Sequence, residues 1–199
     1  MNVIATSVNA IALQQRRVLV GIDGVDGSGK TRFAARLADS LGSSCSAVIH
    51  VDDHLNAPAI RHARGRHSPE GFWLDTYDLG SLTRTIEDVV ARSGKGSTVV
   101  VEGMFLHREE LRSQWDFSVF LDVPFAVTAA RMAVRDGTHP DPEHPSMNRY
   151  VGGQRLYFRT ARPWQWADVV VDNSVDVGAI IQPEDSSAAR LYSGGTAED

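Results

Sequence analysis

Short, continuous apolar runs alternate along the chain with longer segments whose apolar residues recur every three or four positions. The runs predict buried strands, and the periodic segments predict amphipathic helices. We expect strands over 18–22, 47–51, 98–102, 117–121 and 168–172, and helices over 31–41, 79–92 and 124–135. Strands that alternate with helices indicate the α/β class, here a parallel five-stranded sheet with helices on both faces.

Two polar stretches rich in proline and glycine, 56–71 and 136–149, interrupt this alternation. Both follow the carboxyl ends of predicted strands, where open α/β folds place their ligands. Loops of this length in a compact domain are usually either functional or disordered. Residues 183–199 are polar and rich in serine and glycine, which predicts a flexible C-terminal tail. The sequence therefore predicts a single domain over 1–182, followed by this tail.

Composition narrows the class of protein. A net charge of −5 argues against a sequence-independent binder of duplex nucleic acid. The single cysteine, Cys45, excludes a disulfide framework and a Cys-rich zinc site. No apolar run approaches the roughly 20 residues that a membrane span needs, and residues 1–15 lack the features of a signal peptide. We expect a cytoplasmic protein with no membrane or nucleic-acid partner. The sequence is compatible with either a monomer or a homo-oligomer.

The clearest chemical signal is the segment 24–31, which matches the pattern G-x-x-x-x-G-K-[ST] between a predicted strand and a predicted helix. Its glycines let backbone N–H groups surround a phosphate, and the helix N-terminus adds partial positive charge. In such loops the lysine, here Lys30, reaches the β- and γ-phosphates, and the hydroxyl of Thr31 ligates Mg²⁺. The residues that we expect to bind the nucleotide are Gly24, Asp26, Gly27, Ser28, Gly29, Lys30 and Thr31.

Lysine is scarce, and this scarcity excludes one class of phosphate-loop protein. Lys30 and Lys95 are the only lysines among the 20 basic residues, and neither follows an asparagine. The Asn-Lys-x-Asp element by which GTPases read guanine is therefore absent.

The segment 151–155 looks like the signature of ABC transporter ATPases, but it follows the only good Walker B candidate, 99–102, instead of preceding it. We interpret that match as chance.

Carboxylates follow two of the predicted strands. Asp52 and Asp53 come directly after the strand 47–51, and Glu102 ends the strand 98–102. A kinase needs a carboxylate that orients the attacking hydroxyl and accepts its proton, and a second acid that holds Mg²⁺ directly or through water. Each position alone is also compatible with a capping or exposed acid. Together they favour a small-molecule kinase.

At this point the chain resembles the uridine kinase family, to which phosphoribulokinase and pantothenate kinase are related. The resemblance rests on the order G-x-D-G-x-x-G-S-G-K-T, Asp-Asp, Val-Glu-Gly, Arg-x-x-x-Arg-Asp and Ala-Asp-Val-Val-Val-Asp-Asn, and it covers roughly residues 17–173. It implies a P-loop fold like that of the nucleoside monophosphate kinases, with a lid over approximately 131–160. It also implies transfer of a phosphoryl group from ATP to the 5′-hydroxyl of a nucleoside such as uridine or cytidine.

The resemblance implies roles for single residues. Asp52 matches the catalytic aspartate, and Thr31, Glu102 and Asp52 are expected to place Mg²⁺. Arg131 and Arg135 match the start of the lid helix, whose arginines stabilise charge on the transferring phosphoryl group. On the acceptor side the candidates are Asp53, which falls on a variable position, Asp75, near the family's ribose-binding aspartate, Tyr77, His107 and Arg155. For Tyr77 and His107, packing in the core and an ordinary surface position are the alternatives.

The sequence also departs from this family. No arginine follows Arg135-Asp136 until Arg149, so either Arg149 or Arg155 takes the lid role or the lid closes differently. Arg61, His62, Arg64, Arg66 and His67 make 61–67 a basic loop, which suits an anionic substrate but also suits a solvated loop. The alternatives to a nucleoside kinase are thus a kinase for another hydroxyl metabolite, either neutral or anionic, such as a sugar, a sugar phosphate or a pantothenate-like compound, and a regulatory switch that binds ATP without transferring its phosphate.

Overall fold

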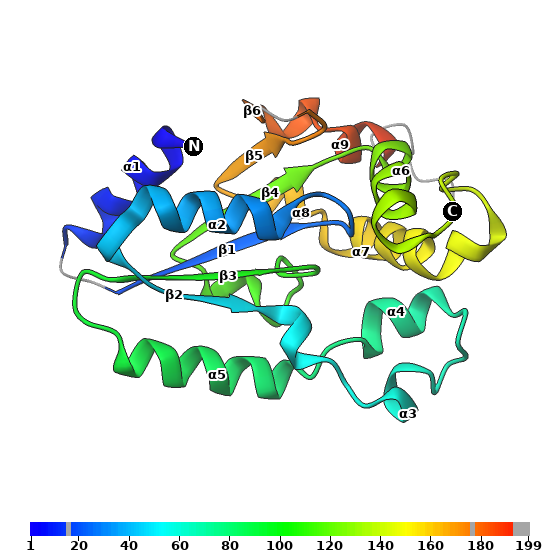
Figure 1. The fold of residues 1–199 in the computed structure, drawn as a ribbon, viewed down its shortest axis with the longest axis horizontal. Helices are drawn as coiled ribbons and strands as arrows, with labels where there is room; N and C mark the ends of the chain where they lie inside the picture. The colour runs from blue at the N-terminus through cyan, green and yellow to red at the C-terminus, as the bar shows by residue number, and fades with distance from the viewer. Residues whose placement is uncertain (15–16, 176–177, 193–199) are drawn as a thin grey trace.

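A computed structural model describes residues 1–14, 17–175 and 178–192 (Figure 1). Its strands are β1 Val18–Gly24, β2 Cys45–His50, β3 Thr98–Gly103, β4 Phe117–Asp122, β5 Val169–Asp172 and β6 Ala179–Ile181. They form one sheet in the order β2-β3-β1-β4-β5-β6, in which β1 to β5 are parallel and β6 pairs antiparallel with β5. The predicted parallel sheet is confirmed, and one antiparallel edge strand is added to the five that we expected.

Helices cover both faces of the sheet, and the alternation of side chains along the strands explains why. In β1, Val20 and Ile22 belong to one apolar cluster and Leu19 to the other. The first face carries α1 Asn2–Ala12 and α2 Lys30–Leu41, and α5 Leu79–Arg92 lies on the opposite face (Figure 1). The remaining helices are α3 Pro58–Arg61, α4 Pro69–Asp75, α6 Phe125–Asp136, α7 Gly153–Ala161, α8 Pro163–Trp166 and α9 Ser187–Tyr192. No helix in the described ranges is both long and apolar enough to span a bilayer.

Short turns complete the connections between these elements. They are η1 Gly42–Ser44, η2 Val51–His54, η3 Arg112–Gln114, η4 Pro145–Met147, the π-helical η5 Asn148–Gly152 and η6 Pro183–Asp185. Two of them carry candidate site residues: η2, after the carboxyl end of β2, contains Asp52 and Asp53, and η5, before α7, contains Arg149.

Part of the polar stretch 56–71 is helical, which the apolar pattern does not predict. Ser68 caps α4 by accepting a hydrogen bond of 3.0 Å from the backbone N–H of Gly71, and Pro69 occupies the first turn. Phe72 and Trp73 then point into the core, where they are 5% and 8% exposed. The stretch therefore joins a surface loop to a helix that is anchored in the protein interior.

The C-terminal segment differs from the flexible tail that the composition predicts. Residues 183–192 form η6 and α9, and residues 193–199 lie outside the described residues. Asp122, at the end of β4, accepts hydrogen bonds from the backbone N–H groups of Ser187 and Ala188 at 2.6 and 3.1 Å. Burial raises the pKa of Asp122 against the effect of these bonds. Because the capping partner lies 65 positions away in the sequence, local composition gives no sign of this helix.

Candidate active site

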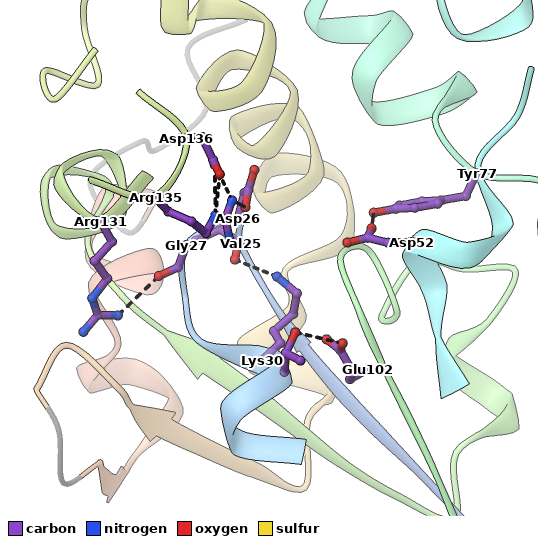
Figure 2. Close-up of polar contacts among 11 residues, drawn as sticks. Val25, Asp26, Gly27, Lys30, Asp52, Tyr77, Glu102, Arg131, Arg135 and Asp136 are labelled. Atoms are coloured by element: carbon purple, nitrogen blue, oxygen red, sulfur yellow. Dashed lines mark hydrogen bonds and ion pairs between the residues drawn. The ribbon is translucent and has the colours of Figure 1, made fainter. Parts of the chain in front are cut away.

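The segment between β1 and α2 has the backbone conformation of a phosphate loop. Gly27 and Gly29 have φ angles of 75° and 90°, in the left-handed region that glycine tolerates best. A Cβ atom at Gly27 would lie 2.8 Å from the carbonyl oxygen of Thr128, and one at Gly29 would lie 2.9 Å from Nδ2 of Asn173. Lys30 Nζ donates to the carbonyl oxygen of Val25 at 2.9 Å, so the lysine folds back over the loop (Figure 2).

A cavity of about 480 Å³ opens above this loop. Residues from the loop, from the carboxyl ends of β2, β3 and β5, and from α6 line it. They are Asp26, Gly27, Gly29, Lys30, Thr31, Arg32, Phe33, Arg36, Asp52, Glu102, Arg131, Arg135, Asn173 and Val175. All the residues expected to be catalytic or to place Mg²⁺ therefore lie at one cavity, whereas Gly24 and Ser28 are buried beneath it.

Thr31 and Glu102 meet beside Lys30. The hydroxyl of Thr31 donates to Oε1 of Glu102 at 3.0 Å, and Nδ1 of His50 lies 2.6 Å from the same oxygen. Glu102 is only 5% exposed, so these two contacts fix the direction of a nearly buried carboxylate. The sequence analysis missed His50; the available signal is a polar residue that ends an apolar strand directly before the Asp pair.

Asp52, on η2, lines the cavity on the side opposite Arg131 and Arg135 (Figure 2). The phenolic hydroxyl of Tyr77 donates to its Oδ1 at 2.6 Å. Burial, followed by the negative charge of Asp52, raises the pKa of Tyr77 well above its ordinary value, so the phenol keeps its proton at neutral pH. Asp52 is exposed on its remaining surface, which leaves its second oxygen open to the cavity.

Two arginines of α6 border the loop on the opposite side from Asp52 (Figure 2). Arg131 donates to the main-chain carbonyl oxygens of Gly27, Asn173 and Ser174 at 3.3, 3.0 and 2.8 Å. Arg135 pairs with Asp136 at 2.6 Å and with Asp26 at 3.0 Å. The hydrogen bond to Asp136 contributes most to raising the pKa of Arg135. Arg135 is thus held by carboxylates, whereas the partners of Arg131 among the described residues are carbonyl oxygens.

The acceptor-side candidates are more scattered. Asp53 is exposed on η2, Asp75 pairs with Arg64 at 2.8 Å, and Arg155 pairs with Glu143. None of these acceptor-side residues lines the cavity, and neither does Tyr77, which reaches it only through Asp52. The structure therefore assembles the phosphate side of a site and leaves the predicted acceptor residues apart.

His107 lies in the interior, in a buried polar network with Asp23 and Tyr157. Its Nδ1 is 2.8 Å from Oδ2 of Asp23, and the same oxygen accepts a hydrogen bond from the hydroxyl of Tyr157. Asp23 also accepts a bond of 2.7 Å from the N–H of Gly24, the first residue of the phosphate motif. Burial alone raises the pKa of Asp23, but the hydrogen bonds and charge of His107 and the bond from Tyr157 outweigh it, and the net pKa is lowered. The network joins β1, the connection after β3 and α7.

Comparison with known proteins agrees with this geometry. A family model described as an AAA domain matches residues 20–151. Uridine kinase from Deinococcus deserti is 27% identical over 88% of this chain and 96% of its own length. Phosphoribulokinase from Synechocystis is also 27% identical, over 88% of this chain and 59% of its own length. A structure described as a possible uridine kinase from Bacillus stearothermophilus superposes with a TM-score of 0.57 at 25% identity, covering 83% of this chain and 97% of that one.

Proposed function

Because the chain belongs to the AAA-domain family of P-loop proteins, we propose that it is an ATP-dependent phosphotransferase that moves the γ-phosphoryl group to a hydroxyl of a small molecule. One observation carries the proposal: the carboxylate of Asp52 lines the same cavity as Lys30 and the loop glycines. A protein that only binds a nucleotide does not need a proton acceptor facing its phosphates, whereas transfer to an alcohol does.

The residues present fit ATP and Mg²⁺. The two positive-φ glycines leave the loop free of Cβ atoms, so that backbone N–H groups can approach phosphate oxygens. Mg²⁺ typically takes one or two protein oxygens together with phosphate oxygens and water. Thr31 and Glu102 would hold it, the former directly and the latter through water, and bound Mg²⁺ neutralises charge on the phosphates.

In the proposed reaction, Asp52 accepts the proton of the attacking hydroxyl through its free oxygen. Tyr77 keeps the other oxygen in place, so the carboxylate does not rotate away from the cavity. The acceptor oxygen forms a bond to the γ-phosphorus, the bond to the bridging oxygen breaks, and ADP leaves with the electron pair of that bond. Lys30 and Arg131 stabilise the negative charge on the transferring group from opposite sides.

We propose a nucleoside, with uridine or cytidine leading, as the acceptor. The motif order supports this class, as do the names of the relatives from Deinococcus and Bacillus. Placement of the protein in the cytoplasm, where ATP and nucleosides meet, belongs to the same proposal.

The test is ADP release by the purified protein with Mg·ATP and a panel of nucleosides, sugars, sugar phosphates and pantothenate. We expect stimulation by uridine or cytidine. In Asp52→Asn, turnover should fall by about 10²- to 10⁴-fold, since that is the usual contribution of a general base, while ATP binding measured by calorimetry stays unchanged. Asp39→Asn, which changes an exposed carboxylate near the end of α2, is the matched control. If no acceptor raises ADP release, the chain is a nucleotide-dependent switch.

A further inference from the structure

Four basic side chains gather between η5 and the segment 61–68, and we call them the basic cluster: Arg61, His62, Arg66 and Arg149. None of them lines the catalytic cavity. In Figure 1, α3 lies at the lower right edge of the molecule, and α4 lies between it and α7. The cluster is therefore separate from the phosphate loop and from the residues proposed to carry out transfer.

Arg149 is buried at the base of this cluster without a carboxylate partner in the described part of the chain. It is 8% exposed, and its guanidinium donates to the carbonyl oxygens of Arg66, Arg61 and Ser68 at 3.2, 3.3 and 3.5 Å. Burial, followed by repulsion from Arg61 and Arg66, lowers the pKa of Arg149. Carbonyl dipoles satisfy its N–H groups, but they do not neutralise a full positive charge.

The other members of the cluster bring more positive charge and leave polar atoms without partners. Nε of Arg61 and Nδ1 of His62 are shielded from solvent and have no hydrogen-bond partner among the described residues. Desolvation lowers the pKa of His62, and repulsion from the positive charges of Arg149, Arg66 and Arg61 lowers it further. The acid whose charge reaches Arg149 is Asp75, and its carboxylate already pairs with Arg64.

We propose that the basic cluster binds a phosphate group at a site distinct from the phosphate loop. An anion here would accept hydrogen bonds from Arg61 and His62 and would offset the charges of Arg66 and Arg149. The unpartnered donors belong to two separate side chains, the guanidinium of Arg61 and the imidazole of His62, and do not form one planar fork, which suits a tetrahedral oxyanion better than a planar carboxylate. Arg149 already joins η5 to the 61–68 segment through carbonyl oxygens, and such a ligand would add charge neutralisation to this contact.

The test is a calorimetric titration of the full chain, with the phosphate loop saturated by Mg·ADP, using inorganic phosphate in one arm and ribose 5-phosphate in the other. We expect saturable binding in at least one arm. The double variant Arg61→Gln/Arg66→Gln should weaken it about tenfold or more, as loss of charge-assisted contacts predicts. Arg84→Gln/Arg92→Gln on α5 removes the same charge elsewhere and should leave binding unchanged.

The two arms identify the source of the phosphate. Equal affinity assigns the site to free phosphate, and tighter binding of ribose 5-phosphate assigns it to a phosphorylated metabolite. Absence of saturable binding in both arms, or binding that survives the double variant, overturns the proposal. Because Arg66 is exposed on the loop, Arg66→Gln alone serves if the double variant does not fold. The titration requires no turnover, so its result is separate from the outcome of the acceptor panel.

Discussion

The two sides of the cleft are built in different ways. The phosphate side consists of consecutive residues, 24–31, whose backbone conformation is set by Gly27 and Gly29. The acceptor side depends on contacts between residues that are far apart in the sequence, such as Tyr77 with Asp52. A site made by local backbone geometry can be recognised from residue spacing, whereas one made by tertiary contacts requires the fold.

Asp23 lies beneath the phosphate motif, where it accepts a hydrogen bond from the N–H of Gly24, and changing it is expected to have the largest effect. Asp23→Asn removes the buried carboxylate that accepts hydrogen bonds from His107 and Tyr157, and the free energy of unfolding should fall by about 3 kcal/mol or more, since each hydrogen bond to a charged group contributes about 1.5–3 kcal/mol. Urea unfolding at pH 7 measures the loss. Asp116→Asn, which changes a partly buried aspartate bonded to the N–H of Leu19, is a control for loss of an ordinary carboxylate contact.

The lowered pKa of Asp23 predicts that protein stability depends on pH. The pKa of Asp23 is lowered from 3.8 in the folded protein, so its stabilisation is fully present above about pH 4 and is lost as pH falls through the lower folded value. The difference in unfolding free energy between wild type and Asp23→Asn should therefore shrink as the pH falls below about 4. A difference that persists unchanged at pH 3 contradicts a lowered pKa for Asp23.

Lys30 tests the phosphate side alone. Lys30→Met should raise the dissociation constant of Mg·ATP about 100-fold or more, because two charge-assisted contacts of about 1.5–3 kcal/mol each are lost. Thermal stability without nucleotide should change little, since the hydrogen bond of Lys30 within the described residues is a single contact to the carbonyl oxygen of Val25. Lys95→Met, at the other lysine of the chain, is the matched control. Equal ATP affinity in Lys30→Met and wild type would show that the loop does not hold the nucleotide as proposed.

Tyr77→Phe tests the acceptor side and should have an intermediate effect. The substitution keeps the ring against Phe105 and removes only the hydrogen bond to Asp52. Turnover should fall about 10-fold, as expected for one hydrogen bond to a charged group, with the KM for ATP unchanged. Tyr150→Phe on η5 leaves Asp52 untouched and serves as the control. A raised KM for ATP without loss of turnover would place Tyr77 in nucleotide binding instead.

The sequence predicted the parts of this protein that depend on local pattern. The parallel strands, α2, α5 and α6 follow from apolar periodicity, and the phosphate loop follows from the spacing of its glycines and Lys30. The alternation could not reveal α4, because Ser68 and Pro69 start that helix inside a polar stretch. It could not reveal α9 either, because Asp122 caps that helix from a distant strand.

Polar residues whose partners are distant in the sequence are the least predictable part of the site and its surroundings. His107 resembles a surface histidine in sequence, yet it is 1% exposed and bonded to Asp23, 84 positions earlier. Asp75 was expected beside an acceptor hydroxyl, but it pairs with Arg64. In both cases the side chain type was informative, and its partner was not predictable without the register of the sheet and the course of the loops.

His50 gives the smallest predicted effect and the sharpest test of how the phosphate side is completed. It comes from β2, yet it contacts Glu102 through the oxygen that also accepts the Thr31 hydroxyl. His50→Leu should weaken Mg·ATP binding about 2- to 10-fold, the effect of one ordinary hydrogen bond, and should leave the affinity for ATP measured in EDTA unchanged. His50→Gln keeps a side-chain donor and should restore most of the loss. Equal weakening with and without Mg²⁺ would mean that His50 supports the cavity wall and not the direction of the Glu102 carboxylate. A Mg²⁺-specific loss would show that the phosphate side depends on a contact from β2, in addition to the contact between Thr31 and Glu102 of β3.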